Sequence, residues 1–129
     1  MTVLADTSIW VEYLRRGRSF QARLDDLLVA GEVVACGPVV AERLAGAKSP
    51  ARGRLWLLLT GLPWAELGPV QWQSIGETSA RLGERGESVA LTDVEIAVAA
   101  VDSSSRLWTR DSDLKQVRAV LPALQFFDP

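Results

Sequence analysis

Short runs rich in apolar residues alternate along this chain with longer segments whose apolar residues recur every three to four positions. The runs lie at residues 2–5, 33–36, 63–67, 106–109 and 123–127. Apolar runs of about four to eight residues between turn residues are typical of strands buried on both faces, as in a parallel sheet. The pattern therefore predicts five short strands.

The segments between these runs have the periodicity of amphipathic helices. Gly17 and Gly31 end the first two helices, and proline favours the first position of the third. Strands that alternate with helices in this way predict one α/β domain over residues 1–129, a three-layer sandwich in which helices flank a short, mostly parallel sheet. The predicted helices lie at residues 9–16, 20–30, 52–60, 70–85 and 113–120, and two more begin at Pro38 and Thr92.

The helix that begins at Thr92 carries several signals. Thr92 and Glu95 have the spacing of a capping box, in which two side chains satisfy backbone N–H groups at a helix start. Asp93 falls in the first turn, where the helix dipole favours negative charge. Ala97 and Ala100 are small, so we expect this helix to lie close against the sheet.

Large apolar side chains predict both a core and an exposed surface. Trp10 and Trp72 lie on apolar faces of predicted helices and Trp108 lies in a predicted strand, so all three are expected in the core. The run at residues 55–59 is apolar all round, and one helix face cannot bury five large residues in a domain of this size. We expect part of that run, including Trp56, to contact a partner or a second copy of the chain.

Composition excludes several classes of protein. No apolar run approaches the roughly 20 residues of a membrane span, and no basic segment marks the first ten residues as a signal peptide. Cys36 is the only cysteine, which excludes an internal disulfide and fits a reducing cytoplasm. The chain has no histidine, which excludes Ser–His–Asp and Cys–His catalysis, histidine-assisted RNA cleavage and histidine-ligated zinc. We expect a cytoplasmic protein without a membrane segment.

Charge gives a local signal only. The formal net charge is −2, so no global basic field attracts nucleic acid. Basic residues nevertheless cluster in two parts of the sequence. The candidates for contacts with an RNA backbone are Arg15, Arg16, Lys48 and Arg52.

Four acids occur at positions that a parallel sheet brings together. Asp6 and Asp111 follow apolar strands, whereas Glu42 and Asp93 lie in the first turns of helices. Because ligands bind outside the carboxyl ends of parallel strands, all four are expected at one edge of the sheet. Each acid alone has an ordinary explanation, as a helix cap, a dipole partner or a solvated helix residue.

Together these acids predict a cation site, because crowded carboxylates repel one another. Mg²⁺ and Mn²⁺ prefer oxygen ligands, and they lower the pKa of a water that they bind. Nearby hydroxyls are candidates for orienting the ligands through hydrogen bonds. These hydroxyls belong to Thr7, Ser8, Thr109 and Ser112.

The order and spacing of these residues resemble the motifs of PIN domains over essentially the whole chain. The matching motifs are Asp6-Thr7-Ser8 after the first strand, Glu42 on the third helix, Asp93 before Ile96-Ala97, and Thr109-Arg110-Asp111 after a strand. The chain is similar to the VapC-type toxin ribonucleases of bacterial toxin–antitoxin pairs. The resemblance implies one or two Mg²⁺ or Mn²⁺ ions bound by the catalytic acids Asp6, Glu42, Asp93 and Asp111, with Asp113 as a further acid.

The same resemblance implies a toxin of a type II toxin–antitoxin pair. Its activity would be that of an endoribonuclease that hydrolyses RNA phosphodiester bonds with metal-activated water, leaving a 5′-phosphate and a 3′-hydroxyl. It also implies a VapB-like antitoxin as partner, and a homodimer.

Two departures from the family pattern leave the four acids untouched. Glu95 stands where an apolar residue is usual, and residues 102–105 replace a turn that commonly contains His or Gly. Two alternatives stay open: a non-catalytic PIN-like module that binds RNA or protein, and a nuclease directed at DNA.

Overall fold

The computed structural model describes residues 1–15 and 18–129, so the predicted helix end at Arg16 and Gly17 lies outside the described residues. The strands are β1 (Thr2–Ala5), β2 (Val33–Cys36), β3 (Trp64–Ala65) and β4 (Ser105–Trp108). The helices are α1 (Thr7–Arg15), α2 (Arg18–Val29), α3 (Gly37–Gly46), α4 (Ala51–Thr60), α5 (Pro69–Glu84), α6 (Leu91–Asp102) and α7 (Asp113–Val117).

The described strands pair in parallel, in the order β3-β2-β1-β4. β1 occupies a central position because its side chains are apolar, and Val3 and Leu4 are completely buried. The segments that follow the four strands all begin at one edge of the sheet, which we call the carboxyl edge. Ligands of parallel α/β sheets bind at such an edge.

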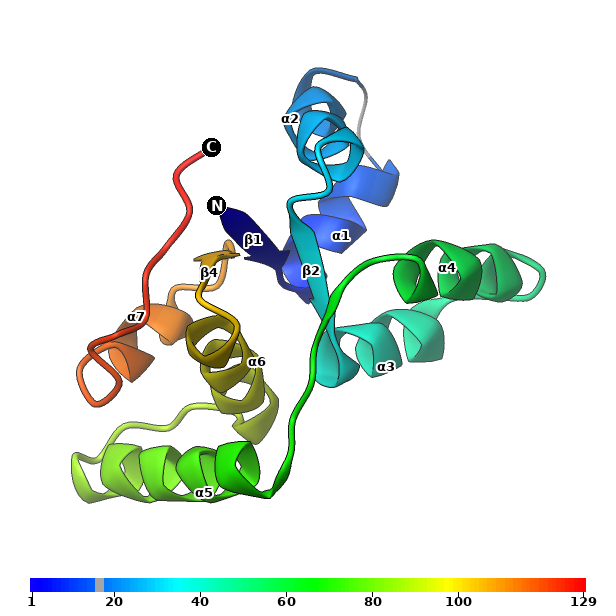
Figure 1. Ribbon diagram of the computed structural model, residues 1–129. Coiled ribbons are helices and arrows are strands. Elements are labelled where there is room, and N and C mark those ends of the chain that lie inside the picture. The colour runs from blue at the N-terminus through cyan, green and yellow to red at the C-terminus, as the bar shows by residue number, and fades with distance from the viewer. Residues whose placement is uncertain (16–17) are drawn as a thin grey trace.

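Helices flank the sheet in two groups, α1–α4 and α5–α7, which confirms the predicted three-layer α/β architecture (Figure 1). The central helix of the second group is α6, which packs against β4, α5 and α7. Its residues Ala97, Ala99 and Ala100 are completely buried, and their small size allows the close packing that the sequence predicted. Within the described ranges, none of the helices has the length and apolar character that a membrane span requires.

Three local predictions were wrong in extent or detail. β3 covers only two of the five residues predicted at 63–67, and α7 ends at Val117 instead of residue 120. The predicted capping box is not formed. The N-cap of α6 is Ala90, without a side-chain cap hydrogen bond, so Thr92 lies inside the helix.

The predicted last strand, residues 123–127, contacts the sheet at a single parallel bridge between Leu107 and Phe126. The N–H of Leu107 donates to the carbonyl of Gln125, and the N–H of Phe127 donates to the carbonyl of Leu107, both at 2.8 Å. These two bonds use both backbone groups of Leu107. The segment therefore touches β4 at one point and forms no fifth strand.

The tryptophans divide between core and surface. Trp10 and Trp108 are buried as predicted. The same prediction for Trp72 was wrong, because this side chain is 47% exposed. The buried residues of α5 are Ile75, Thr78 and Leu82, and Trp72 lies one turn before them, where the helix extends past its buried stripe.

Candidate active site

Asp6 is the first residue after β1, and it is only 4% exposed. Its Oδ1 atom accepts hydrogen bonds from the Ser8 hydroxyl (2.5 Å) and the Ile9 N–H (3.2 Å), and its Oδ2 atom accepts one from the Thr109 hydroxyl. The Ile9 bond is that of an N-cap, so Asp6 also caps α1. Burial raises the pKa of Asp6, and the hydrogen bonds partly oppose this shift.

A chain of hydrogen bonds continues from Asp6 into the segment after β4. The Thr109 hydroxyl, which donates to Asp6, also accepts the N–H of Asp111 at 2.9 Å. The Oδ1 atom of Asp111 in turn accepts the N–H of Asp113 at 2.9 Å. Thr109 therefore joins the carboxyl ends of β1 and β4 and fixes the backbone that carries the next two acids.

A second connection, between α1 and the segment after β4, was not predicted. The Arg110 guanidinium forms an ion pair with Glu12 of α1, and the Arg110 N–H donates to the Ser8 hydroxyl at 3.2 Å. In the sequence, Arg110 belongs to the motif at residues 109–111 without a role of its own, and Glu12 matches no motif. Only the packing of α1 against the segment after β4 reveals this pair.

Asp93, Asp111 and Asp113 each offer a carboxylate oxygen, and these oxygens lie within 4.8 Å of one another. Asp93 comes from the first turn of α6, and the other two come from the segment after β4. Burial, together with the negative charges of Asp111, Asp6, Glu42 and Asp113, raises the pKa of Asp93 to about 6. We call these five acids the acid cluster.

Glu42 is exposed on α3, and its Oε1 atom accepts a hydrogen bond from the Thr7 hydroxyl at 2.7 Å. Because Thr7 directly follows Asp6, this bond holds the Glu42 carboxylate at the same edge, and its charge contributes to the raised pKa of Asp93. Three of the four hydroxyls predicted to orient the acids therefore bond to an acid. The fourth residue, Ser112, is the N-cap of α7 and makes no side-chain cap hydrogen bond.

Cys36 lies at the end of β2 beneath this edge. Burial raises the pKa of its thiol to about 11, and the charges of Glu95, Glu42 and Asp6 contribute to the shift. A buried thiol with this pKa is protonated at neutral pH and is a poor nucleophile. The chemistry of this edge is therefore that of carboxylates.

The donor set fits a hard divalent cation. Mg²⁺ and Mn²⁺ take oxygen ligands, and they are held by few carboxylates and several waters. The close oxygens of Asp93, Asp111 and Asp113 meet this requirement, because every side-chain donor is a carboxylate oxygen. A cation among them would also offset their mutual repulsion, which is about 4 kcal/mol for unit charges 4 Å apart at an effective dielectric constant of 20.

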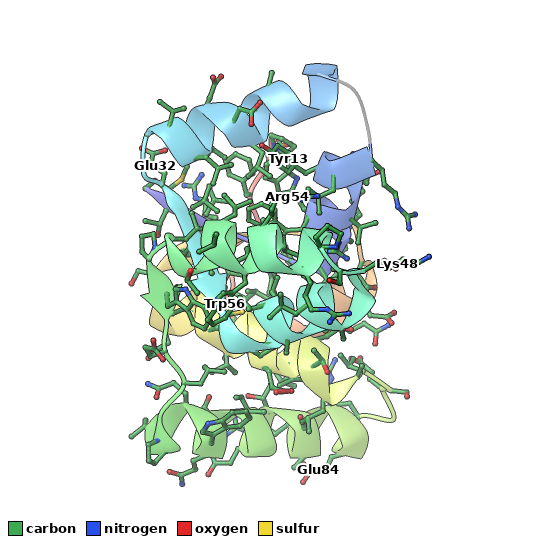
Figure 2. All side chains as sticks on the ribbon, turned by 90° about the vertical axis from the view of Figure 1, so that its right-hand side faces the viewer. Tyr13, Glu32, Lys48, Arg54, Trp56 and Glu84 are labelled. Carbon is green, nitrogen blue, oxygen red and sulfur yellow. The ribbon has the colours of Figure 1, made fainter. Side chains whose placement is uncertain are left out.

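A second feature lies away from the acids, on the face formed by α4 (Figure 2). Leu55 and Leu59 point into the core, whereas Trp56, Leu57 and Leu58 are 46%, 72% and 38% exposed. This confirms the prediction that part of the apolar run is exposed. Beside it lies a cavity of about 370 Å³, which we call the α4 groove, lined by Leu14, Arg43, Ala47, Ala51, Arg54, Leu55 and Leu58.

The described basic residues that were predicted to contact RNA lie near this groove. Arg15, Lys48 and Arg52 are exposed, and the Arg52 guanidinium donates to the carbonyl of Ala47, which lines the groove, at 3.1 and 3.2 Å. Burial, and then the charge of Arg15, lowers the pKa of Arg43 in the same wall. Their contact with RNA stays a prediction, and Arg16 lies outside the described residues.

These features define an α/β domain with an acidic carboxyl edge, and the model of the PIN domain family matches residues 3–120. The chain belongs to the PIN domain family. It is 32% identical over 114 residues to Ribonuclease VapC32 of Mycobacterium tuberculosis, which covers 88% of this chain and 87% of that protein. This confirms the predicted family and its VapC resemblance.

Solved structures with the same fold include two complexes. One is VapBC2 from Rickettsia felis bound to a promoter DNA fragment, with a TM-score of 0.77, 20% identity, and 98% of each chain covered. The other is VapBC-1 from nontypeable Haemophilus influenzae, with a TM-score of 0.77, 20% identity, and 99% of this chain and 98% of that chain covered. At this level of identity the likeness establishes the α/β fold.

Proposed function

We propose that this chain is a metal-dependent endoribonuclease and the toxin of a toxin–antitoxin pair. The observation that carries the proposal is the approach of the carboxylate oxygens of Asp93, Asp111 and Asp113 to within 4.8 Å at the carboxyl edge. Membership of the PIN domain family and the relation to a VapC ribonuclease support the same reading.

In this proposal the five acids have three tasks: three acids hold the cation, one positions a ligand and one accepts a proton. Asp93, Asp111 and Asp113 hold Mg²⁺ or Mn²⁺, which when bound neutralises phosphate charge and activates water. Asp6, which the family resemblance implied as a ligand, accepts three hydrogen bonds, and here we assign it instead to positioning Asp111 through the Thr109 hydroxyl. Glu42, oriented by its hydrogen bond from Thr7, accepts the proton of the attacking water at its carboxylate.

The absence of histidine from the sequence fits this assignment of proton transfer to a carboxylate. Water attacks the phosphorus in line with the 3′-oxygen, the P–O3′ bond breaks and the 3′-oxygen takes up a proton, which leaves a 5′-phosphate and a 3′-hydroxyl. The RNA 2′-hydroxyl takes no part. The same acids are suited to DNA, so the substrate has to be tested with both nucleic acids.

The test uses one sequence synthesised as single-stranded RNA and as single-stranded DNA. The purified chain should cut the RNA with Mn²⁺, lose activity in EDTA and regain it when Mn²⁺ is restored. Asp93→Asn, purified identically, controls for contaminating nucleases. Cleavage in EDTA, or cleavage by this variant at the rate of the wild type, would contradict the mechanism. Preferential cleavage of the DNA strand would favour the alternative substrate.

The antitoxin is proposed to bind at the α4 groove. The groove combines the exposed apolar side chains of Leu14 and Leu58 with the basic side chains of Arg43 and Arg54. An amphipathic partner segment with acidic flanks matches this surface. Trp10, which the sequence analysis placed in the core, is buried and so takes no part, although Leu14 of the same helix does.

Co-expression with the product of the neighbouring reading frame, followed by size-exclusion chromatography, tests this partner. The two chains should elute together, and RNA cleavage should stop. The elution volume of the chain alone also tests the predicted homodimer, for which the exposed Trp56 and Leu57 provide apolar surface.

A further inference from the structure

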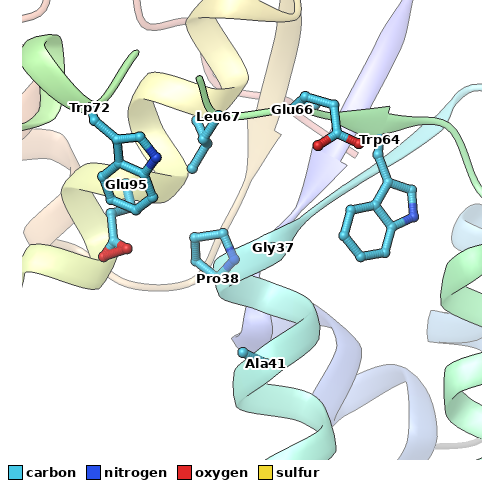
Figure 3. Close-up of a pocket in the computed structure, with 9 residues that line it drawn as sticks. Gly37, Pro38, Ala41, Trp64, Glu66, Leu67, Trp72 and Glu95 are labelled. Carbon is cyan, nitrogen blue, oxygen red and sulfur yellow. The ribbon is translucent and has the colours of Figure 1, made fainter. Parts of the chain in front are cut away.

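A second cavity of about 370 Å³ lies between the segments that follow β2 and β3 (Figure 3). Pro38 of α3 forms one wall, and the indoles of Trp64 and Trp72 form two others. Two carboxylates, Glu66 and Glu95, also line it. We call this cavity the tryptophan pocket, and no role in the proposed mechanism explains it.

The two indoles differ in exposure: one is held in place and the other is open to a flat ligand. Trp64 is half-buried, and its Nε1–H donates to the carbonyl of Leu59 at 3.0 Å, which fixes the ring. Trp72 is 47% exposed, so it presents an open aromatic surface at the cavity mouth. A nucleobase of any identity can stack on such a side chain.

The carboxylates select which part of a nucleic acid enters. A phosphate would be repelled by Glu66 and Glu95, whereas the N–H groups of a base edge can donate hydrogen bonds to them. Guanine presents two adjacent donors, N1–H and the 2-amino group, which match the two oxygens of one carboxylate. Adenine and cytosine offer one exocyclic amino group, and uracil offers only its ring N–H.

Two helices, α3 and α6, carry residues of both the tryptophan pocket and the acid cluster. On α3, Ala41 lines the pocket and is followed by Glu42; on α6, Glu95 lines the pocket and lies two residues after Asp93. The negative charge of Glu42 acts on both Asp93 and Glu95. A strand whose phosphate lies at the acid cluster can therefore place a neighbouring base in the pocket.

We propose that the tryptophan pocket is a base-binding subsite of the nuclease, in which Trp72 stacks on a guanine and Glu95 accepts hydrogen bonds from its N1–H and 2-amino group. This assignment rests on the proposed function. It predicts a preference for guanine at one fixed position beside the cleaved bond.

The first test is cleavage of a randomised RNA pool with Mn²⁺, followed by sequencing of the product ends. Trp72→Ala should lower cleavage about 10-fold whichever base is bound, because stacking does not depend on base identity. Glu95→Gln should lower the guanine preference about 10-fold, because the lost contact is a bidentate one. Matched controls on α5, outside the pocket, are Val70→Ala and Glu84→Gln, which should change neither quantity.

The second test measures binding, so that it stands even if no cleavage is found. The anisotropy of labelled octauridylate is compared with that of the same RNA carrying one central guanosine, in Ca²⁺. Tighter binding of the guanosine RNA, lost in Glu95→Gln, would support the subsite even where the ribonuclease proposal fails. Equal binding of the two RNAs, or a guanine preference that survives Glu95→Gln, would overturn it. Light scattering measures the oligomeric state of the same variants. If Trp72→Ala abolishes self-association and leaves RNA binding and cleavage unchanged, the pocket binds a second copy of the chain and the base-binding proposal is wrong.

Discussion

The acid cluster and the α4 groove are both unfavourable in the isolated chain, but for opposite reasons. The acid cluster gathers like charges, and the oxygens of Asp93, Asp111 and Asp113 approach within 4.8 Å of one another, so its cost is electrostatic. The α4 groove and the helix face beside it leave Leu58, Trp56 and Leu57 in contact with water, and the cost is that of exposed apolar surface. A cation relieves the first cost and a macromolecular partner relieves the second.

The two regions are also held in place differently. Hydrogen bonds from Ser8 and Thr109 fix the carboxylate of Asp6, whereas burial of Leu55 and Leu59 fixes α4. Changes in one region should therefore leave the other intact. This independence makes catalysis and partner binding separable by mutation.

Removal of one charge from the acid cluster should have the largest effect. Asp93→Asn should lower kcat/KM for RNA by about 10²–10³-fold, the usual cost of losing a preorganised electrostatic group. In EDTA the same variant should be at least as stable as the wild type, because a repelling charge is gone. Thermal unfolding in EDTA checks this, with Glu84→Gln as the control. A large loss of stability in Asp93→Asn would instead favour a structural role for this acid.

A charge placed in the α4 groove should have the next largest effect. Leu58→Asp should weaken antitoxin binding by about 10²-fold, because the new carboxylate removes an apolar contact and repels the acidic flanks of the partner segment. RNA cleavage by the free chain should stay unchanged. Titration calorimetry measures the affinity, and Val70→Asp places the same charge on a surface outside the groove. Equal weakening by both variants would contradict the assignment of the groove.

Thr109 should have an intermediate effect, because it acts through Asp6 and Asp111. Thr109→Val removes the hydroxyl that joins them and should raise the Mn²⁺ concentration for half-maximal activity by about 10–100-fold. The matched control is Thr60→Val, which removes a hydroxyl bonded only to carbonyls of α4. Saturating Mn²⁺ should restore most of the activity of Thr109→Val, and failure to do so would argue against a positioning role.

The pH dependence of stability without metal should show the smallest effect. The pKa of Asp93 is raised from 3.8 to about 6 in the folded chain, so its contribution to stability is present below pH 4 and is lost as the pH rises through 6. The free energy of unfolding of the wild type, relative to Asp93→Asn, should fall by about 1–2 kcal/mol from pH 4 to pH 7, a value reduced for partial exposure. Urea denaturation in EDTA measures this difference. A flat or rising difference would contradict the proposed repulsion.

The fold was largely predictable because the local sequence is enough to identify most of its strands. β1 and β2 are short apolar runs between polar or glycine residues, and their predicted bounds match those observed. The segment at 123–127 has a similar composition, yet it pairs only through Leu107 and Phe126. Whether an apolar segment forms a ladder depends on the backbone groups left free by its neighbour, which composition does not reveal.

The sequence was enough to predict at which edge of the sheet the acids lie, but not the contacts between segments that are far apart in the chain. Parallel topology brings Asp6 and Asp111 to one edge, and Asp93 follows from the first turn of α6. The ion pair of Glu12 with Arg110 depends on packing between segments far apart in the sequence. The exposure of Trp72 was missed for a similar reason, because helical periodicity does not show where the neighbouring layer ends.

The most direct test of the central claim is a crystal structure grown with Mn²⁺, with anomalous scattering recorded near the manganese edge. The account predicts an anomalous peak in contact with carboxylate oxygens of Asp93, Asp111 and Asp113, which lie close enough to share one ion. Crystals of Asp93→Asn grown in the same way should show a weaker peak or none. A map without a peak at the carboxyl edge, or with its peak on other residues, would contradict the claim that these acids hold the catalytic cation.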